Sequence, residues 1–498
     1  MIHLRFFPVL LLSAASFIST ASAQNPPITR PSGSILDRIM TQAEPGSGAW
    51  TAEQIATMSR LRNEAMNDPY AYSKLTYLAD GIGPRLSGSV QADAAVEWVA
   101  TQMRALGATV TLEKTPVPHW VRGEEKGELT AWPGNVPGTT QKIILTALGN
   151  SVATPAAGLT APVTVVSSFA ELNSLPAGAV SGKIVLFNVP FDKEMTAEGQ
   201  GLAAYLQVAP YRVIGPSVAA KLGAAAILVR SLGSKDLRIP HTGAVLYAED
   251  TGKVPAAAVT AEDADLIARL TTQGPVTMHL TLTPQTLPAG TSYNVIADWK
   301  GSEHPEQVVI VSGHLDSWDL GTGAIDDGSG IVTAMETIQL LKSLNIHPRR
   351  TIRFVAWMNE ESGASGAATY GQEHAMEFGN HVAVMESDLG CNHPTGLFLS
   401  SSALAEYLAP VGEALKPIGA GTLTHVDQVP SEDLAPMIAN GVPSLAPAQD
   451  SRFYFNYHHT AADTLDKIDK HQLAENSAVI AVTAYALADA SVSAPRAK

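Results

Sequence analysis

Four short stretches of the chain gather histidine and carboxylate side chains, the groups that bind divalent metal ions. They read His314-Leu315-Asp316, Ala324-Ile325-Asp326-Asp327-Gly328-Ser329-Gly330, Asn359-Glu360-Glu361 and Glu386-Ser387-Asp388. Each stretch alone is typical of a solvated loop or turn, but all four lie within residues 314–388. A carboxylate-rich set that includes histidine suits Zn²⁺, with Co²⁺ or Mn²⁺ as substitutes. Together the stretches predict a metal site.

The chemistry that such a set serves is hydrolysis by a pair of metal ions. Two divalent ions about 3.5–4 Å apart clamp the attacking and leaving sides of the reaction and need a carboxylate to bridge them. Each ion also takes terminal histidine or carboxylate ligands and keeps a position open for water. A neighbouring carboxylate that binds no metal then accepts the proton of the attacking water.

A fifth stretch begins at Tyr457-His458-His459-Thr460 and follows an aromatic segment at residues 453–455. A histidine here can complete the metal site from a loop. Taken alone, a histidine pair beside aromatic residues is more often a packing or surface feature.

The stretches fall where predicted strands end. Residues 308–311, 351–357 and 382–385 predict strands, and residues 330–344 and 371–378 predict helices. This alternation predicts an α/β fold with a mostly parallel, mixed sheet and helices on both faces. Ligands bind at the carboxyl ends of the strands in such sheets, so the strand tips are expected to converge on one site.

The chain between the N-terminal helices and this sheet has a different character. Residues 90–106 have a helical apolar face that ends at Gly107. Short Val- and Ala-rich runs, Gly and Pro turns and short helical pieces then follow. We predict a separate, mainly β domain at residues 116–284, inserted into an α/β domain made of residues 51–115 and 285–498.

The N-terminal residues resemble an export signal. Arg5 precedes an apolar run at residues 6–18, which is followed by Ala21-Ser22-Ala23. We predict a signal peptide at residues 1–23 and a flexible lead-in, rich in Pro, Ser and Gly, at residues 24–50. The run is too short to span a bilayer, so a secreted or periplasmic protein without a membrane anchor is expected.

Composition excludes several other classes. A formal net charge of −15 argues against a nucleic acid or an anionic membrane as partner. Cys391 is the only cysteine, so no internal disulfide forms. A lone thiol without activating neighbours is expected to be a small buried hydrophobe, and not a nucleophile.

The five stretches, in this order, resemble the co-catalytic zinc aminopeptidase and carboxypeptidase family. The resemblance covers nearly the whole chain after the predicted signal, and the fifth stretch continues it as His459-Thr460-Ala461-Ala462-Asp463-Thr464. The inserted segment is similar to a protease-associated domain, at Gly182-Lys183-Ile184-Val185-Leu186, Gly223-Ala224-Ala225-Ala226-Ile227 and Val254-Pro255-Ala256. The resemblance implies two Zn²⁺ per chain, a peptide substrate and a homodimer.

The resemblance also assigns ligands. Asp326 would bridge the two ions. His314 and Asp388 would complete the ligands of one ion, and Glu361 and His459 those of the other.

The supporting roles follow in the same way. Glu360 would be the general base and later the proton donor to the leaving amine. Asp316 would orient His314 by accepting its ring N–H, as metal-bound histidines usually require. His459 is preferred to His458 because the family's histidine is followed by Thr or Ser.

One departure bears on the substrate. Related enzymes often carry Ser-Asp or Thr-Asp, then a polar residue and Phe, where this chain has Ser431-Glu432-Asp433-Leu434-Ala435-Pro436. Asp433, Tyr454 and Tyr457 are candidate substrate-pocket residues, with core packing as the alternative for the tyrosines. Asp327 is expected beside the site and not as a ligand.

The function expected from this resemblance is a secreted di-zinc exopeptidase acting on dipeptides or short peptides with free termini. An aminopeptidase that releases N-terminal residues from longer peptides is the close alternative, since both use the same metal core. A non-catalytic binding protein on this scaffold would lack metal ligands, and a single-zinc cyclotransferase departs from the two-metal set.

Overall fold

The computed structural model describes residues 49–496. The predicted signal peptide, residues 1–23, and the predicted lead-in up to residue 48 lie outside the described residues. Trp50, at the end of the lead-in, donates its ring N–H to the carbonyl of Ala486 at 2.8 Å. Within the described part of the chain, no helix is long and apolar enough to cross a bilayer.

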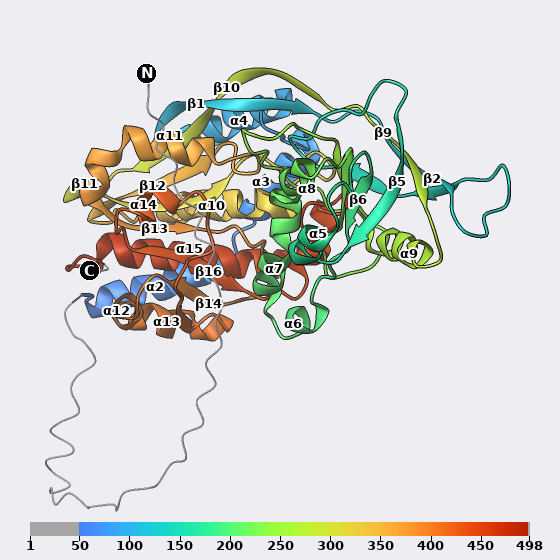
Figure 1. Ribbon diagram of the computed structural model, residues 1–498. Helices are drawn as coiled ribbons and strands as arrows, with labels where there is room; N and C mark the ends of the chain where they lie inside the picture. Colours follow the sequence, from blue (N-terminus) through green and yellow to red (C-terminus); the bar gives the residue numbers. More distant parts are fainter. Residues whose placement is uncertain (1–48, 497–498) are drawn as a thin grey trace, which may run out of the picture. The chain divides into compact units, whose positions relative to one another are not determined.

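The first sheet carries the predicted alternation of strands and helices (Figure 1). Its spatial order is β1-β10-β12-β11-β13-β16-β14-β15, and β12, β11, β13 and β16 run parallel to one another. The strands are β1 (Thr109–Val121), β10 (Gln285–Trp299), β11 (His304–His314), β12 (Arg350–Trp357), β13 (His381–Glu386), β14 (Pro394–Leu399), β15 (Thr422–His425) and β16 (Ser444–Gln449).

Helices cover both faces of this sheet, because successive strand residues point to opposite sides. Val309 and Val311 of β11 lie in a core with α4, α10 and α15, whereas Val308 and Ile310 lie in a core with α11 and α14. The predicted α/β architecture is therefore confirmed. The helices of this region include α2 (Ala52–Ala65), α3 (Tyr70–Thr76), α4 (Val90–Leu106), α10 (Ser329–Ser343), α11 (Ser365–Glu373), α12 (Ser402–Tyr407), α13 (Ala409–Leu415), α14 (Ala435–Ile438) and α15 (Lys470–Asp489).

The helix α4 shows why the local prediction succeeds. The Ser89 hydroxyl accepts the backbone N–H of Ala92 at 3.1 Å and caps the first turn. Gly107 ends the helix in the left-handed conformation, with φ of 101°, which glycine adopts without steric cost. The strand that follows, β1, continues to Val121 in antiparallel pairing with β10.

A second mixed sheet is built from the chain between β1 and β10. Its order is β3-β2-β9-β5-β6-β7-β8-β4. The strands are β2 (Glu125–Ala131), β3 (Gln141–Ile143), β4 (Leu145–Ala147), β5 (Leu159–Val166), β6 (Ile184–Phe187), β7 (Ala226–Arg230), β8 (Ala256–Val259) and β9 (Thr277–Leu282). The helices are α5 (Phe169–Ser174), α6 (Lys193–Ala197), α7 (Gly201–Val213), α8 (Gly215–Lys221) and α9 (Ala261–Thr271).

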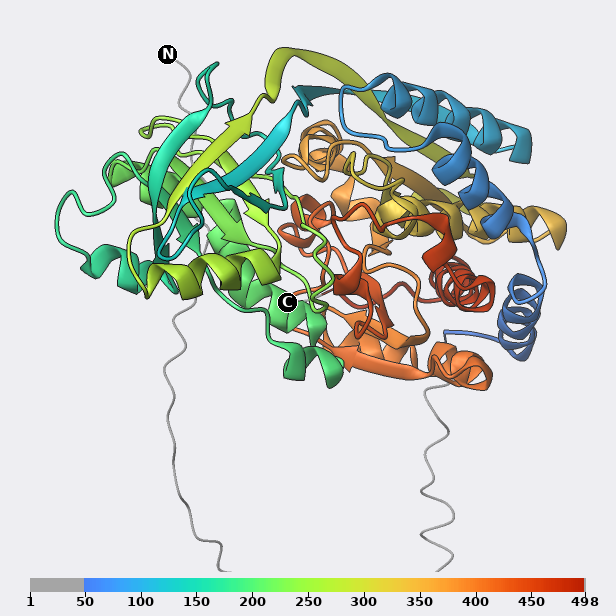
Figure 2. The same ribbon diagram turned by 90° about the vertical axis from the view of Figure 1, so that its right-hand side faces the viewer.

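Two details of this segment differ from the sequence-based expectation. The predicted start of the insertion, Pro116, falls inside β1. The helix α7 is longer than the short helical pieces expected here; Pro210 lies inside it and reads in sequence as a helix breaker. Figure 2 shows the second sheet, at the left, beside the first, with β10 running from one to the other.

Side chains from the loop after β11 tie the two sheets together. Arg122 lies between β1 and β2 and pairs with Asp319 at 2.7 Å and with Glu125 at 2.7 Å. Trp318 packs on Gly149, where a Cβ atom would approach the indole ring to 2.0 Å. The loop that follows His314 is thus held by the second sheet.

Candidate metal centre

The predicted strand tips lie on adjacent parallel strands. The order β12-β11-β13 places the ends of these strands side by side. His314 is the last residue of β11, Glu361 follows β12, and Asp388 follows β13. The expectation that these tips meet at one edge is met in the structure.

The candidate ligands form two groups that share one carboxylate. The Nε2 atom of His314 lies 3.1 Å from Oδ1 of Asp326 and 3.2 Å from Oδ1 of Asp388. The Nε2 atom of His459 lies 3.3 Å from Oδ2 of Asp326 and 3.0 Å from Oε2 of Glu361. Asp326 therefore turns one oxygen toward each group, as a carboxylate that bridges two ions must.

His458 and Asp327 lie beside this set. The ring of His458 stacks on that of His459 at 3.6 Å, and its Nε2 is 3.7 Å from Oδ2 of Asp326. Asp327 accepts backbone N–H bonds from His314 and Gly330, each at 3.0 Å. Both residues belong to groups of ligand atoms within 4.8 Å of one another. The shorter contacts favour His459 over its neighbour, and the two backbone bonds of Asp327 agree with a supporting role.

Asp316 supports the site differently from the expectation. The Nδ1 atom of His314 lies 3.0 Å from the backbone carbonyl oxygen of Asp316, whereas the carboxylate oxygen is 4.0 Å away. The carboxylate instead accepts the backbone N–H groups of Asn359 at 2.7 Å and of Glu360 at 3.0 Å. Asp316 therefore positions both the histidine and the candidate base.

Two residues that the sequence did not single out hold the loops of the centre. Asp463 accepts the backbone N–H of Ile325 at 2.6 Å and of Asp326 at 3.2 Å. Burial, and then the charge of Asp326, raises the pKa of Asp463 to about 7. The buried Arg85 donates to the carbonyl of Leu315 at 2.8 Å. The position of Asp463 in the fifth stretch is a signal from which its role could have been predicted. Arg85 lies in no motif, so the sequence offers no such signal for it.

Burial and crowding shift the pKa values of the carboxyl groups and histidines in this site. Burial, and then the charges of Asp388 and Glu361, raises the pKa of Glu360 well above its usual value. Burial, and then the charge of Asp326, raises the pKa of Glu361 to about 7. Burial by itself would lower the pKa of His459, but Glu361 and Asp326 outweigh it and raise this pKa to about 9. Carboxylates crowded in this way gain from a nearby positive charge.

Two buried oxygens test whether metal ions fit here. Oε1 of Glu361 has no hydrogen-bond partner among the described residues, and Oδ2 of Asp326 accepts no hydrogen bond although Nε2 of His459 lies 3.3 Å away. A buried ionised oxygen without a partner is costly unless a cation binds it. Imidazole nitrogens and carboxylate oxygens are ligands that zinc accepts. The residues present therefore fit divalent ions.

A small pocket of about 10 Å³ borders the ligands, roughly the space of one water molecule. It is lined by Trp318, Gly321, Gly323, Asp326, Glu361, His459, Thr460 and Asp463. None of the three candidate pocket residues lines it. Asp433 is fully buried with both carboxylate oxygens unpartnered, and Tyr454 is buried against the rings of Phe455 and His458. The packing of Tyr454 is that of a core residue, and a substrate role for Asp433 and Tyr457 stays a prediction.

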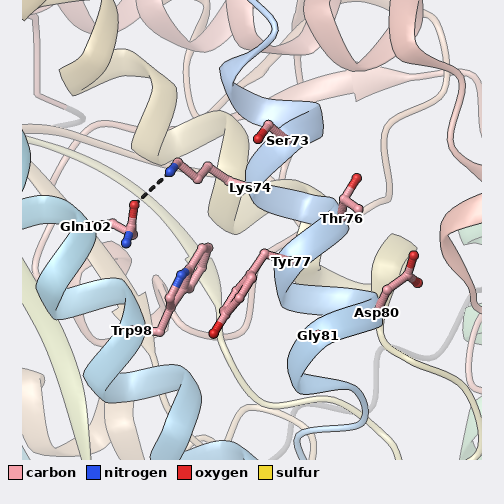
Figure 3. Close-up of a pocket in the computed structure, with 8 residues that line it drawn as sticks. All are labelled: Ser73, Lys74, Thr76, Tyr77, Asp80, Gly81, Trp98 and Gln102. Carbon is pink, nitrogen blue, oxygen red and sulfur yellow. Dashed lines mark hydrogen bonds between the residues drawn. The ribbon is translucent and has the colours of Figure 1, made fainter.

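A separate hollow of about 730 Å³ lies between α3 and α4. Figure 3 shows Tyr77 and Trp98 side by side in it, with Lys74 donating to Gln102. None of the candidate metal ligands lines this hollow. It is therefore distinct from the metal centre.

Comparison with known proteins agrees with this geometry. The model of peptidase family M28 matches residues 294–484. Human carboxypeptidase Q is 38% identical over 86% of this chain and 87% of its own length. These findings confirm the family resemblance carried by the five stretches. Residues 313–318, 324–327 and 385–388 favour carboxypeptidase Q within the family, and that likeness is confirmed as well.

Solved structures show the same fold. A peptidase M28 precursor from Shewanella amazonensis SB2B has a TM-score of 0.84 at 34% identity, covering 90% of this chain and 99% of its own. A zinc aminopeptidase from Bacillus subtilis has a TM-score of 0.61 at 21% identity, covering 84% of this chain and 94% of its own. With its relatives and its fold in agreement, the chain belongs to peptidase family M28.

Proposed function

We propose that the protein is a di-zinc metallo-exopeptidase that hydrolyses dipeptides or short peptides with free termini. The observation that carries this proposal is the position of Asp326 between two groups, each containing a histidine and a second carboxylate. Carboxypeptidase Q, by its name, removes residues from a chain end, which supports an exopeptidase.

Two zinc ions would share Asp326. His314 and Asp388 would complete the ligands of one ion, and Glu361 and His459 those of the other. The unpartnered oxygens of Asp326 and Glu361 support this assignment. When bound, the ions would polarise the peptide carbonyl and lower the pKa of a water molecule.

The protein's own contribution to the reaction is the movement of a proton. Glu360 accepts a proton from the attacking water and delivers it to the leaving amine as the peptide C–N bond breaks. Its backbone N–H donates to Asp316 at 3.0 Å, and the neighbouring N–H of Asn359 donates to the same oxygen. These bonds support a fixed position for the base beside the ligands.

The remaining parts of the chain have roles outside the chemistry. The second sheet is proposed to be a protease-associated domain that shapes access to the centre, since it holds the loop at Trp318 and Asp319. Residues 1–23 are proposed to direct export, on the strength of their sequence.

The test is hydrolysis of a substrate panel by the mature protein, with and without a chelator. The panel contains free dipeptides, N-blocked dipeptides and aminoacyl-nitroanilides, with Glu360→Gln measured in parallel. We expect cleavage of free dipeptides that is lost on chelation and in the variant. Preference for nitroanilides and longer peptides would identify an aminopeptidase, and binding of two ions without any cleavage would refute the exopeptidase.

A further inference from the structure

The loop between β12 and α11 carries both the candidate base Glu360 and the candidate ligand Glu361. Parts of its backbone adopt a conformation that residues with side chains rarely take. Asn359 and Ala364 have positive φ angles of 71° and 51°. Such residues stay in the left-handed region only where the surrounding structure fixes them. The shape of the loop therefore depends on contacts from neighbouring elements.

Asn294 on β10 makes such contacts at both ends of the loop. Its Oδ1 atom accepts the backbone N–H of Met358 at 3.0 Å, directly after β12. Its Nδ2 atom donates to the backbone carbonyl of Gly366 at 2.9 Å, in the first turn of α11. Gly366 in turn donates its N–H to the carbonyl of Met358 at 3.0 Å. One side chain thus joins the residues at which the loop begins and ends.

The space around this amide is closely filled. Asn294 is fully buried. A Cβ atom on Gly366 would approach Oδ1 of Asn294 to 2.3 Å and the carbonyl oxygen of Met358 to 2.4 Å. Only a residue without a side chain lets α11 begin against the amide. A buried polar group whose hydrogen bonds are all made holds its neighbours in one arrangement.

The pairing of β1 with β10 directs the amide toward the loop. Asn294 lies opposite Glu113 in this antiparallel pair, and Glu113 accepts the second N–H of the amide at 2.8 Å. Thr115 stands two residues further along β1 and therefore projects from the same face. Its hydroxyl donates to the carbonyl of Ser365 at 3.0 Å. The two strands thus hold the beginning of α11 through a second side chain as well.

We propose that Asn294 is a positioning residue for the general base Glu360; this rests on the proposed exopeptidase function. Asp316 binds the backbone of Glu360 itself, whereas Asn294 fixes the two ends of the loop that carries it. A general base must lie within hydrogen-bond reach of the proton that it accepts. A misplacement of about 1 Å can lower the rate by about 10²-fold. Asn294 acts on the reaction through this loop.

The test measures kcat, KM and bound zinc for Asn294→Ala at saturating zinc, with a free dipeptide as substrate. We expect kcat to fall by about 10- to 100-fold, because the base is displaced. KM and the number of bound ions should stay at their wild-type values. In a Glu360→Gln background the same change should lower kcat very little, since a base that has been removed cannot be misplaced.

Thr115→Val is a milder change that answers the question if Asn294→Ala does not fold. It removes the hydroxyl that holds Ser365 and should lower kcat by about 3- to 10-fold, again only while Glu360 is present.

Thr351→Val is the matched control. Thr351 is fully buried at the opposite end of β12, where its hydroxyl accepts the N–H of Gly301 at 3.1 Å and donates to the carbonyl of Pro305 at 2.8 Å. The change should lower the melting temperature and leave kcat at its wild-type value.

Three results would overturn the inference and leave the exopeptidase intact. One is wild-type kcat in folded Asn294→Ala or, where that variant does not fold, in Thr115→Val. Another is an equal loss of kcat with and without Glu360, which would show that Asn294 does not act through the base. The third is an equal loss in Thr351→Val, the mark of general destabilisation. A wild-type protein that cleaves no peptide refutes the exopeptidase itself, and the inference with it.

Discussion

Two regions along helix α10 bury carboxyl groups in opposite ways. Just before the helix, Asp326 lies among histidines and other carboxylates. In the middle of the helix, Glu336 is fully buried, accepts a hydrogen bond from Ser477, and has one oxygen without a partner. After burial, the charge that raises the pKa of Glu336 is that of Asp68.

The difference shows how a fold accommodates a buried acid. Glu336 stands nearly alone and is kept neutral, because burial raises its pKa to about 8. Several carboxyl groups lie together at the strand tips, and a hydrolytic site needs some of them ionised. Two histidines carry too little positive charge to balance all of them. We propose that bound cations balance the charge of these acids, whereas a retained proton neutralises Glu336. We therefore assign Glu336 a structural role and propose that the carboxylates at the strand tips act in the reaction.

The largest effect is expected for Glu360→Gln. Loss of the general base should lower kcat by about 10²- to 10⁴-fold, the usual contribution of acid–base catalysis. The zinc content should not change, because Glu360 is not assigned as a ligand. Steady-state kinetics with metal analysis measures both. A variant that keeps more than a tenth of wild-type activity would remove Glu360 from the mechanism.

Asp326→Asn tests whether metal binding depends on the acid before α10 and not on the acid in the middle of that helix. A neutral amide is a poor bridging ligand, so we expect bound zinc to fall below the wild-type count and activity to fall with it. Glu336→Gln, a matched change at the solitary acid, should leave zinc unchanged. Equal zinc in Asp326→Asn and wild type would show that Asp326 does not join the ions.

Glu336→Gln should alter the pH dependence of stability. Below pH 4.5 the group is protonated in both the folded and unfolded states. Between pH 4.5 and about 8 only the unfolded state releases the proton, so stability falls as pH rises. Glutamine removes this slope and should stabilise the protein above pH 8 by on the order of a few kcal/mol. Urea titrations from pH 5 to 9 measure the effect.

The control for that prediction is Glu53→Gln, which removes one exposed carboxylate from α2. It should leave the wild-type slope in place. A Glu336→Gln variant that follows the same slope as wild type would show that Glu336 is ionised in the folded protein.

The smallest effect is expected for Ser477→Ala. This change removes the side-chain hydrogen bond to Glu336 and should cost about 1 kcal/mol of unfolding free energy. Zinc content and activity should remain at wild-type values, because the hydrogen bond is made with Glu336 and not with a residue of the metal centre. Loss of zinc in this variant would mean that the two regions are coupled through α10.

The sequence was sufficient for features that depend on local pattern. The helix at residues 90–106 is recognisable because its apolar period and Gly107 lie in the same short segment. The metal-binding stretches are recognisable because ligand types follow strand patterns directly, as His314 follows β11. The family resemblance added a role to each residue.

Features that arise from tertiary packing were out of reach. Arg212 comes from a region without a metal motif and meets His459 only because α7 packs over the centre. The choice between the two acceptors of Asp316, its carbonyl and its carboxylate, depends on the path of the loop after β11. Arg212 lies on α7, which the sequence did not predict as one long helix. Pro210 lies inside α7, and a proline usually ends a helix.

The most direct test of the metal centre is the number of zinc ions bound per chain. Metal-free protein is titrated with zinc, and bound metal and dipeptide hydrolysis are followed on the same samples. We expect two ions per wild-type chain, with activity rising to a plateau as the second ion binds. Full activity with a single bound ion would contradict a centre in which Asp326 is shared by two ions.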